Sequence, residues 1–242
     1  MRVALGDVIL RAWDGWAGPF VETQIAGTAD PGALADALDA WCHGALGASI
    51  DRAHWYHASV GMVAGLTLTD GTSVVVKAYQ PRFTERFLST VVSIQRHLAT
   101  GFYPCAAPLG GPRPFGLGWA TAETMIADPG PTPAMDRDLV SAATGLARLV
   151  RYAEGQPAAG LDPHPLQAAP GVRYPAPHSA VFDFAVDEAT AGWIDALADV
   201  AIMARLTDTS RPVVTHSDWS ARNVRLGRHG VSAVFDLDSL AL

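Results

Sequence analysis

Residues whose types could do chemistry gather near the end of this 242-residue chain. The run HSDWSARN occupies positions 216–223, and the run FDLD follows at positions 235–238. Phosphoryl transfer asks a protein for a carboxylate that accepts the proton of a hydroxyl group, and for oxygen ligands that hold Mg²⁺ between the phosphates. Asp218 could supply the first function, and Asn223 and Asp236 could supply the second.

The spacing of these residues predicts that they meet. Positions 224–226 and 231–235 are largely apolar and flank the turn GRHG, so they predict a final β-hairpin. Asn223 lies just before its first strand and Asp236 just after its second. Because an antiparallel hairpin brings its two open ends together, both oxygen ligands can reach one ion. Asp218 lies on the loop that leads to the same end.

The pattern His-x-Asp-x4-Asn, followed by VFDLD at 234–238, resembles the motifs of the aminoglycoside phosphotransferase and choline kinase-like family. In that family the metal-binding aspartate follows two apolar residues, and the glycine of the D-F-G motif is often lost. The resemblance implies Asp218 as the catalytic base, Asn223 and Asp236 as metal ligands, and His216 as a brace of the loop. It assigns Asp238 either to the metal or to fixing the loop.

Lys77 supplies independent support for this resemblance. It ends the apolar strand VVVK after a DG turn, and so resembles the lysine that contacts the α- and β-phosphates of ATP in kinase-like enzymes. The resemblance also requires a glutamate on the following helix to pair with this lysine. Val91 occupies the expected place, Glu85 lies upstream and Gln95 one turn later, so the identity of the partner stays open.

Two further segments match the nucleotide-binding lobe of that family more loosely. Residues 59–65, SVGMVAG, are a poor match to G-x-G-x-x-G, and they could be a phosphate-covering turn or a plain strand with two glycines. Met125 and Ile126 stand where backbone groups of the connection between lobes usually bind the adenine edge. Packing in a buried strand accounts for both side chains equally well.

Periodicity and turn residues predict the elements that position these residues. Helices are expected over 31–46, 84–100, 136–152 and 187–206, and strands over 63–69, 72–79 and 119–126. The inner face of the last helix is expected to consist of Trp193, Ile194, Leu197, Val200, Ala201 and Ala204. The implied fold class is α+β: a two-lobed protein kinase-like fold with an antiparallel-sheet N-lobe over 1–126 and a mostly helical, incomplete C-lobe over 127–242.

Composition narrows the classes of function. Two isolated cysteines give no zinc or disulfide framework, and a net charge of −7 disfavours a nucleic-acid or anionic-membrane binder. No apolar run could span a bilayer and no secretory signal opens the chain, so a cytoplasmic location is expected. The oligomeric state cannot be inferred from any pattern in the sequence.

The resemblance implies ATP and Mg²⁺ as cofactors and the hydroxyl of a small molecule as acceptor, on an aminoglycoside, amino alcohol or sugar-like compound. In the resembled family, further helices follow the metal motif and supply much of the acceptor pocket. This chain ends shortly after Asp238. A truncated reading frame or fragment is therefore expected, with a naturally shortened form as the alternative.

Two other functions stay open. A catalytically dead kinase relative would bind nucleotide without turnover, and the weak glycine turn and missing helix glutamate favour it. Residues 233–240, AVFDLDSL, also resemble the first motif of haloacid dehalogenase-type phosphatases, with Asp236 as nucleophile and Asp238 as acid/base. That motif opens an α/β domain, whereas here it lies at the end of the chain and leaves the run at 216–223 unexplained.

Overall fold

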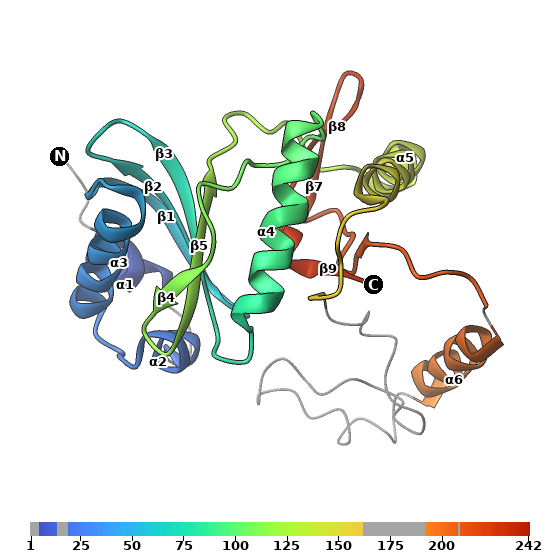
Figure 1. The fold of residues 1–242 in the computed structure, drawn as a ribbon, viewed down its shortest axis with the longest axis horizontal. Helices are drawn as coiled ribbons and strands as arrows, with labels where there is room; N and C mark the ends of the chain where they lie inside the picture. The colour runs from blue at the N-terminus through green and yellow to red at the C-terminus, as the bar shows by residue number, and fades with distance from the viewer. Residues whose placement is uncertain (1–4, 14–18, 162–191, 208) are drawn as a thin grey trace.

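The structure is a computed structural model that describes residues 5–13, 19–161, 192–207 and 209–242. An antiparallel sheet with helices on both faces forms the first part of the molecule, and α5, α6 and short β-ribbons form the second (Figure 1). This is the predicted succession of a sheet-containing lobe and a mostly helical one. No helix in the described part of the chain combines the length and apolar character needed to cross a bilayer.

The first sheet has five strands in the order β1-β2-β3-β5-β4, all antiparallel. The strands are β1 (Ile50–Ala58), β2 (Met62–Leu68), β3 (Ser73–Tyr79), β4 (Arg113–Phe115) and β5 (Gly118–Thr124). The predicted hairpin over the turn at 70–71 is present as β2 and β3. Its turn places Gly71 at φ +87°, a backbone conformation that favours glycine. β1 was not predicted from the sequence.

Helices cover the two faces of this sheet. One face packs against α1 (Leu5–Ala12), α2 (Phe20–Ala26) and α3 (Pro31–Leu46), and the other faces α4 (Glu85–Thr100), as Figure 1 shows. The predicted cap of α3 is present, because Asp30 accepts a hydrogen bond from the backbone N–H of Ala33. The helices α1 and α2 were not predicted from the sequence. The buried carboxylate of Glu22 fixes α2 by accepting hydrogen bonds from Trp13 and Tyr56.

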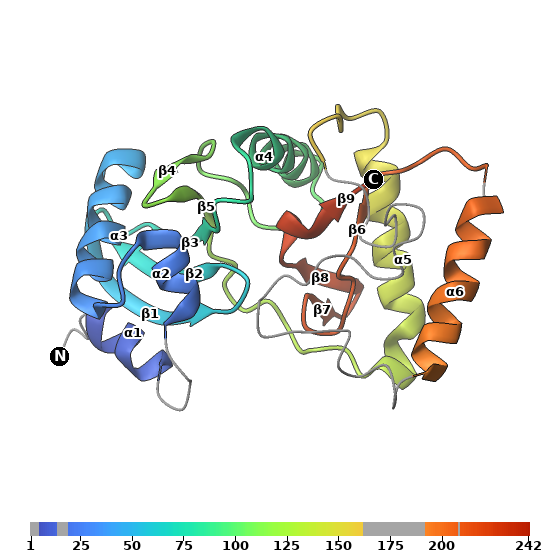
Figure 2. The same ribbon diagram turned by 90° about the horizontal axis from the view of Figure 1, so that it is seen from below.

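The second part of the molecule contains the two candidate motifs, residues 216–223 and 235–238. It contains α5 (Met135–Ala153), β6 (Thr215–His216), β7 (Val224–Gly227), β8 (Gly230–Val234), the 3-10 helix η1 (Leu237–Ser239) and β9 (Leu240–Ala241). The predicted final hairpin is present as β7 and β8, and β6 pairs with β9 beside it (Figure 2). Both ribbons lie between α4 and α5.

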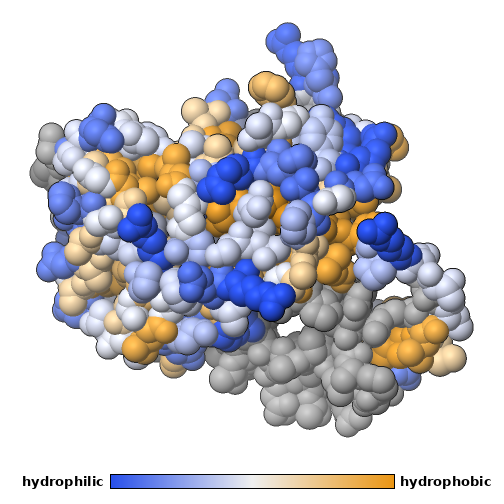
Figure 3. Space-filling view, viewed as in Figure 1, coloured by the Kyte–Doolittle hydropathy of each residue, from blue (hydrophilic) through white to orange (hydrophobic). Residues whose placement is uncertain are grey.

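The helix α6 (Gly192–Thr207) corrects one prediction. The helix is present, although its expected first residues, 187–191, lie outside the described part of the chain. Its predicted inner face is exposed: Trp193 is 67% exposed, Leu197 60% and Val200 67%. Figure 3 shows an apolar surface where α6 lies in Figure 1. The apolar periodicity correctly predicted a helix, but burial of a face also needs a packing partner, which the tertiary arrangement decides.

The connection between β5 and α5 is fixed to the β7–β8 hairpin. Ser232 Oγ donates a hydrogen bond to the carbonyl oxygen of Pro129 at 2.6 Å, and the Leu226 N–H donates to Pro131 at 3.0 Å. Gly130, at φ +93°, passes so close that an added Cβ would lie 2.6 Å from the carbonyl oxygen of Leu226. The boundary expected between residues 126 and 127 falls in this connection and stays a prediction.

Candidate active site

His216 holds the loop at 216–223 against the β7–β8 hairpin. Its imidazole Nδ1 accepts a hydrogen bond from the backbone N–H of Asp218 at 3.2 Å. The ring must then carry its proton on Nε2, which donates to the carbonyl oxygen of Phe235 at 2.9 Å. Burial lowers the pKa of His216, although the hydrogen bond to Phe235 acts in the opposite direction. A neutral ring therefore connects the two predicted motifs.

Asp218 and Asn223 are in direct contact across this loop. The side-chain amide of Asn223 donates to the Asp218 carboxylate oxygen Oδ2 at 2.9 Å and to its backbone carbonyl at 3.0 Å. Asp218 itself is exposed, so solutes can reach its carboxylate. Trp219 packs beneath the loop, edge-on to His216 with ring centroids 5.7 Å apart, and contacts the core there.

Asn223 and Asp236 both lie at the open end of the β7–β8 hairpin, where the spacing placed them. The backbone N–H of Phe235 donates to the carbonyl oxygen of Asn223 at 2.9 Å, which places the next residue, Asp236, beside Asn223. Asp236 has a left-handed backbone with φ 61°. Such a conformation is uncommon for a residue other than glycine, and strained backbone of this kind is concentrated at functional sites.

Lys77 reaches this end of the hairpin from β3. Its ammonium Nζ lies 2.9 Å from Asp238 Oδ1, 3.7 Å from Asp236 Oδ1 and 3.8 Å from Glu123 Oε1. Burial alone would lower the pKa of Lys77. The nearby carboxylates of Asp238 and Glu123 have the larger effect, so the pKa of Lys77 is raised above its usual value. Asp238 is therefore the nearest ion-pair partner of Lys77. Its assignment to the metal or to fixing the loop stays a prediction.

The helix α4 does not supply the carboxylate that pairs with Lys77. Val91 is buried in the core between the lobes, and Glu85 is exposed at the start of the helix. Gln95 faces the site instead, and its side-chain amide donates to Glu123 Oε2 at 2.7 Å. Glu123 was not predicted from the sequence as a partner of Lys77. No local signal points to it, because Glu123 shares a face with Lys77 only through the register that pairs Lys77 with Thr121 across β3 and β5.

The oxygen-rich site fits a hard divalent cation. The Asp236 pKa is raised to about 7, first by the carboxylate of Asp238 and then by burial, so negative charge is crowded there. Within the described ranges, no group of three or more His, Cys, Asp or Glu could hold a metal by itself. Mg²⁺ commonly binds one or two carboxylates together with phosphate oxygens and water. Asn223 and Asp236 can supply the protein's share of such a set.

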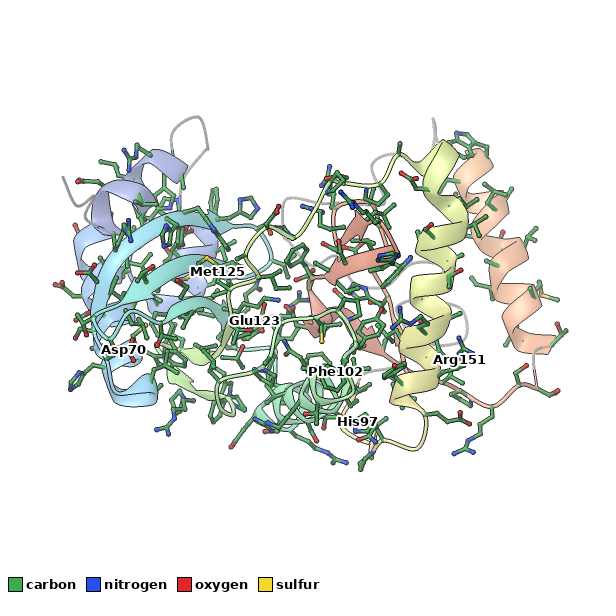
Figure 4. The ribbon with its side chains drawn as sticks, turned by 90° about the horizontal axis from the view of Figure 1, so that it is seen from above. Asp70, His97, Phe102, Glu123, Met125 and Arg151 are labelled. Atoms are coloured by element: carbon green, nitrogen blue, oxygen red, sulfur yellow. The ribbon has the colours of Figure 1, made fainter. Side chains whose placement is uncertain are left out.

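The residues expected to contact the nucleotide base lie at the end of β5. Glu123 lies on β5 and Met125 directly follows the end of that strand; Figure 4 shows the two residues close together at the sheet. The backbone N–H of Met125 donates to Ser73 O at 3.1 Å, so a base contact through Met125 would use its carbonyl oxygen. Ile126 follows in the connection, partly exposed. The base contact of both residues stays a prediction.

The segment 59–65 is a turn followed by the start of β2, and the covering of phosphates by this turn stays a prediction. Ser59–Gly61 form the turn between β1 and β2, and β2 begins at Met62. The side-chain amide of Gln80 donates to the carbonyl oxygen of Val60 at 2.6 Å and holds the turn. Gly61 approaches the neighbouring strand closely, since an added Cβ would lie 2.8 Å from the carbonyl oxygen of Ala78. This turn therefore requires a glycine for a packing reason.

This arrangement agrees with what comparison of the chain with known proteins finds. The model of the phosphotransferase enzyme family, APH, matches residues 66–242. The chain belongs to this family. Among curated proteins, none matches the chain.

Solved structures share the two-lobed, protein kinase-like fold. A spectinomycin phosphotransferase, APH(9)-Ia, solved with ADP and spectinomycin, is 16% identical with a TM-score of 0.52, over 86% of this chain and 69% of that one. A thermostable mutant of the aminoglycoside phosphotransferase APH(4)-Ia is 15% identical with a TM-score of 0.51, over 84% and 71%. The chain spans 59% of the length of an amicoumacin kinase to which it is also similar, at 13% identity over 78% of this chain and a TM-score of 0.48.

The phosphatase interpretation of residues 233–240 is wrong on structural grounds. In the resembled phosphatases that motif opens an α/β domain, whereas Asp236 follows the second strand of a two-stranded antiparallel hairpin. Asp238 is paired with Lys77 at 2.9 Å. The family match also covers this segment.

Proposed function

We propose that this protein transfers the γ-phosphoryl group of ATP to a hydroxyl group of a small molecule. The observation that carries the proposal is the chain of contacts from Asp218 through Asn223 to the segment of Asp236, with Lys77 3.7 Å beyond it. A base, two oxygen ligands and a phosphate-binding cation are the groups that this reaction requires.

Asp218 acts as the base in this proposal. The acceptor hydroxyl gives its proton to the Asp218 carboxylate, its oxygen bonds to the γ-phosphorus, and the bond from that phosphorus to the bridging oxygen breaks to release ADP. Asn223 orients the carboxylate by its 2.9 Å hydrogen bond to Oδ2. Lys77 draws the phosphates to the sheet. Mg²⁺ held by Asn223 and Asp236 would neutralise the charge on the phosphate oxygens.

The acceptor class follows from the family and remains part of the proposal. The solved relatives above are described with spectinomycin or as aminoglycoside phosphotransferases. We infer a small molecule with one or more hydroxyl groups, such as an aminoglycoside, an amino alcohol or a sugar-like compound. ATP consumption measured across a panel of such acceptors would identify the one that is used.

Substitution of the base tests the mechanism. Asp218→Asn should lower turnover by at least about 100-fold, because the amide cannot take the proton, while the binding of Mg·ATP persists. Asp36→Asn, which neutralises an exposed aspartate on α3, is the matched control and should keep full activity. Near-normal turnover by Asp218→Asn would show that Asp218 is not the base. Mg·ATP binding without turnover in the wild type, with every acceptor, would favour the dead-relative alternative.

A further inference from the structure

The carboxylate that holds the site lysine in this chain comes from an unexpected element. Lys77 sits on β3, and the next helix, α4, directs a neutral amide toward the site. Val91, the sequence candidate for the acidic position, is 4% exposed and packs in the core. An apolar side chain there leaves the helix without a charge to offer to Lys77.

Gln95 does not supply a carboxylate to Lys77 but holds the carboxylate of Glu123 in place. Its buried side-chain Nε2 donates two hydrogen bonds, to Glu123 Oε2 at 2.7 Å and to the carbonyl oxygen of Ala106 at 3.0 Å. Both N–H groups of the amide are therefore used, and the amide cannot rotate without losing one of them. The other carboxylate oxygen of Glu123, Oε1, faces Lys77 Nζ at 3.8 Å.

The other two acidic partners of Lys77 belong to a different part of the molecule. Asp236 and Asp238 lie after β8, at the end of the hairpin where the cation is expected. Glu123 lies on β5, directly paired with β3 in the same sheet. The distance between Lys77 and Glu123 is thus set by the sheet ladder and by an amide on α4, and it does not depend on what the hairpin binds.

We propose that Glu123, held by Gln95, is the positioning residue that directs Lys77 toward the nucleotide phosphates. The acidic residue that positions Lys77 then lies on the sheet strand β5, where a glutamate on the helix α4 was expected. The helix α4 contributes the side-chain amide of Gln95, which connects it to the site through Glu123. This inference rests on the proposed function, since it assumes that Lys77 binds phosphates.

Paired binding measurements test it. The dissociation constants of Mg·ADP and of adenosine are measured for the wild type, for Glu123→Gln and for the exchange variant Gln95→Glu/Glu123→Gln. The control is Glu85→Gln, which removes an exposed glutamate from α4, the helix that carries Gln95. Glu123→Gln should weaken Mg·ADP about tenfold, because Lys77 then collapses onto Asp236 and Asp238, and it should leave adenosine unchanged. The exchange should recover part of the loss, and Glu85→Gln should bind as the wild type does. Thermal unfolding without ligand confirms that each variant is folded.

The outcomes distinguish a failure of the positioning role of Glu123 from a failure of the proposed phosphotransferase function. Unchanged or tighter Mg·ADP binding by Glu123→Gln, or an exchange variant that recovers nothing, would overturn the positioning role. Equal weakening of Mg·ADP and adenosine would overturn it as well, since that result indicates a distorted site. A wild type that binds neither ligand would instead overturn the proposed function.

Discussion

Lys77 Nζ and Asp238 Oδ1 lie 2.9 Å apart although 161 positions separate them in the sequence. The lysine belongs to the sheet of the first lobe and the aspartate to η1 in the second. Their contact is an ion pair between the lobes, and Lys77 is almost fully buried within it. The same pair joins the phosphate-binding side of the proposed site to its metal-binding side.

Removal of Lys77 should destabilise the protein more than removal of its nearest partner. Lys77→Met leaves three carboxylates crowded without a cation and should cost about 3 kcal/mol in the free energy of unfolding at neutral pH. Asp238→Asn should cost less, because Glu123 and Asp236 still pair with the lysine. Urea unfolding of both variants gives the comparison. A Lys77→Met variant as stable as the wild type would show that the ammonium does not hold the lobes together.

The buried His216 should make stability depend on pH. Its pKa is lowered, chiefly by burial, so the unfolded chain takes up this proton at a higher pH than the folded protein does. The contribution of His216 to stability should therefore fall as pH drops through the ordinary histidine range near 6.5, by at most about 1.4 kcal/mol per pH unit. The raised pKa of Asp236 acts in the opposite direction, so the comparison is made with a variant that lacks only the histidine.

Unfolding of His216→Asn and of the wild type between pH 8 and about 5.5 measures that contribution. The variant should show the shallower decline, since it has lost the group that titrates. His229→Asn, which removes an exposed histidine from the β7–β8 turn, is the matched control for loss of a histidine. Identical pH slopes for His216→Asn and the wild type would contradict the prediction.

Gly130 should be intolerant of a side chain. Gly130→Ala places a Cβ 2.6 Å from the carbonyl oxygen of Leu226, on a backbone with φ +93°, so both overlap and strain oppose it. We expect a loss of about 2–4 kcal/mol in the free energy of unfolding. Gly155→Ala is the control, because Gly155 has φ +76° with nothing within 4 Å and should show the backbone strain alone. Equal losses from the two substitutions would show that the connection does not press on the hairpin.

The local structure around the candidate site was readable from the sequence of this protein. The spacing of Asn223 and Asp236 around a hairpin was enough to place both at its open end, because antiparallel pairing is a local rule. The Asp30 cap, the turn at 70–71 and the apolar periodicity of α4 are local in the same sense. Each depends on residues within a few positions of one another.

Long-range packing decided what the sequence could not. Nothing local to Lys77 indicates that its acidic neighbours are Asp238 and Glu123, since those contacts depend on how β5 and η1 are brought to β3. The exposure of Trp193 and Leu197 on α6 is decided in the same way, because a helical stripe predicts a face and only the tertiary fold gives that face a partner. Sequence periodicity is a property of one element, whereas an ion pair or a buried surface belongs to two.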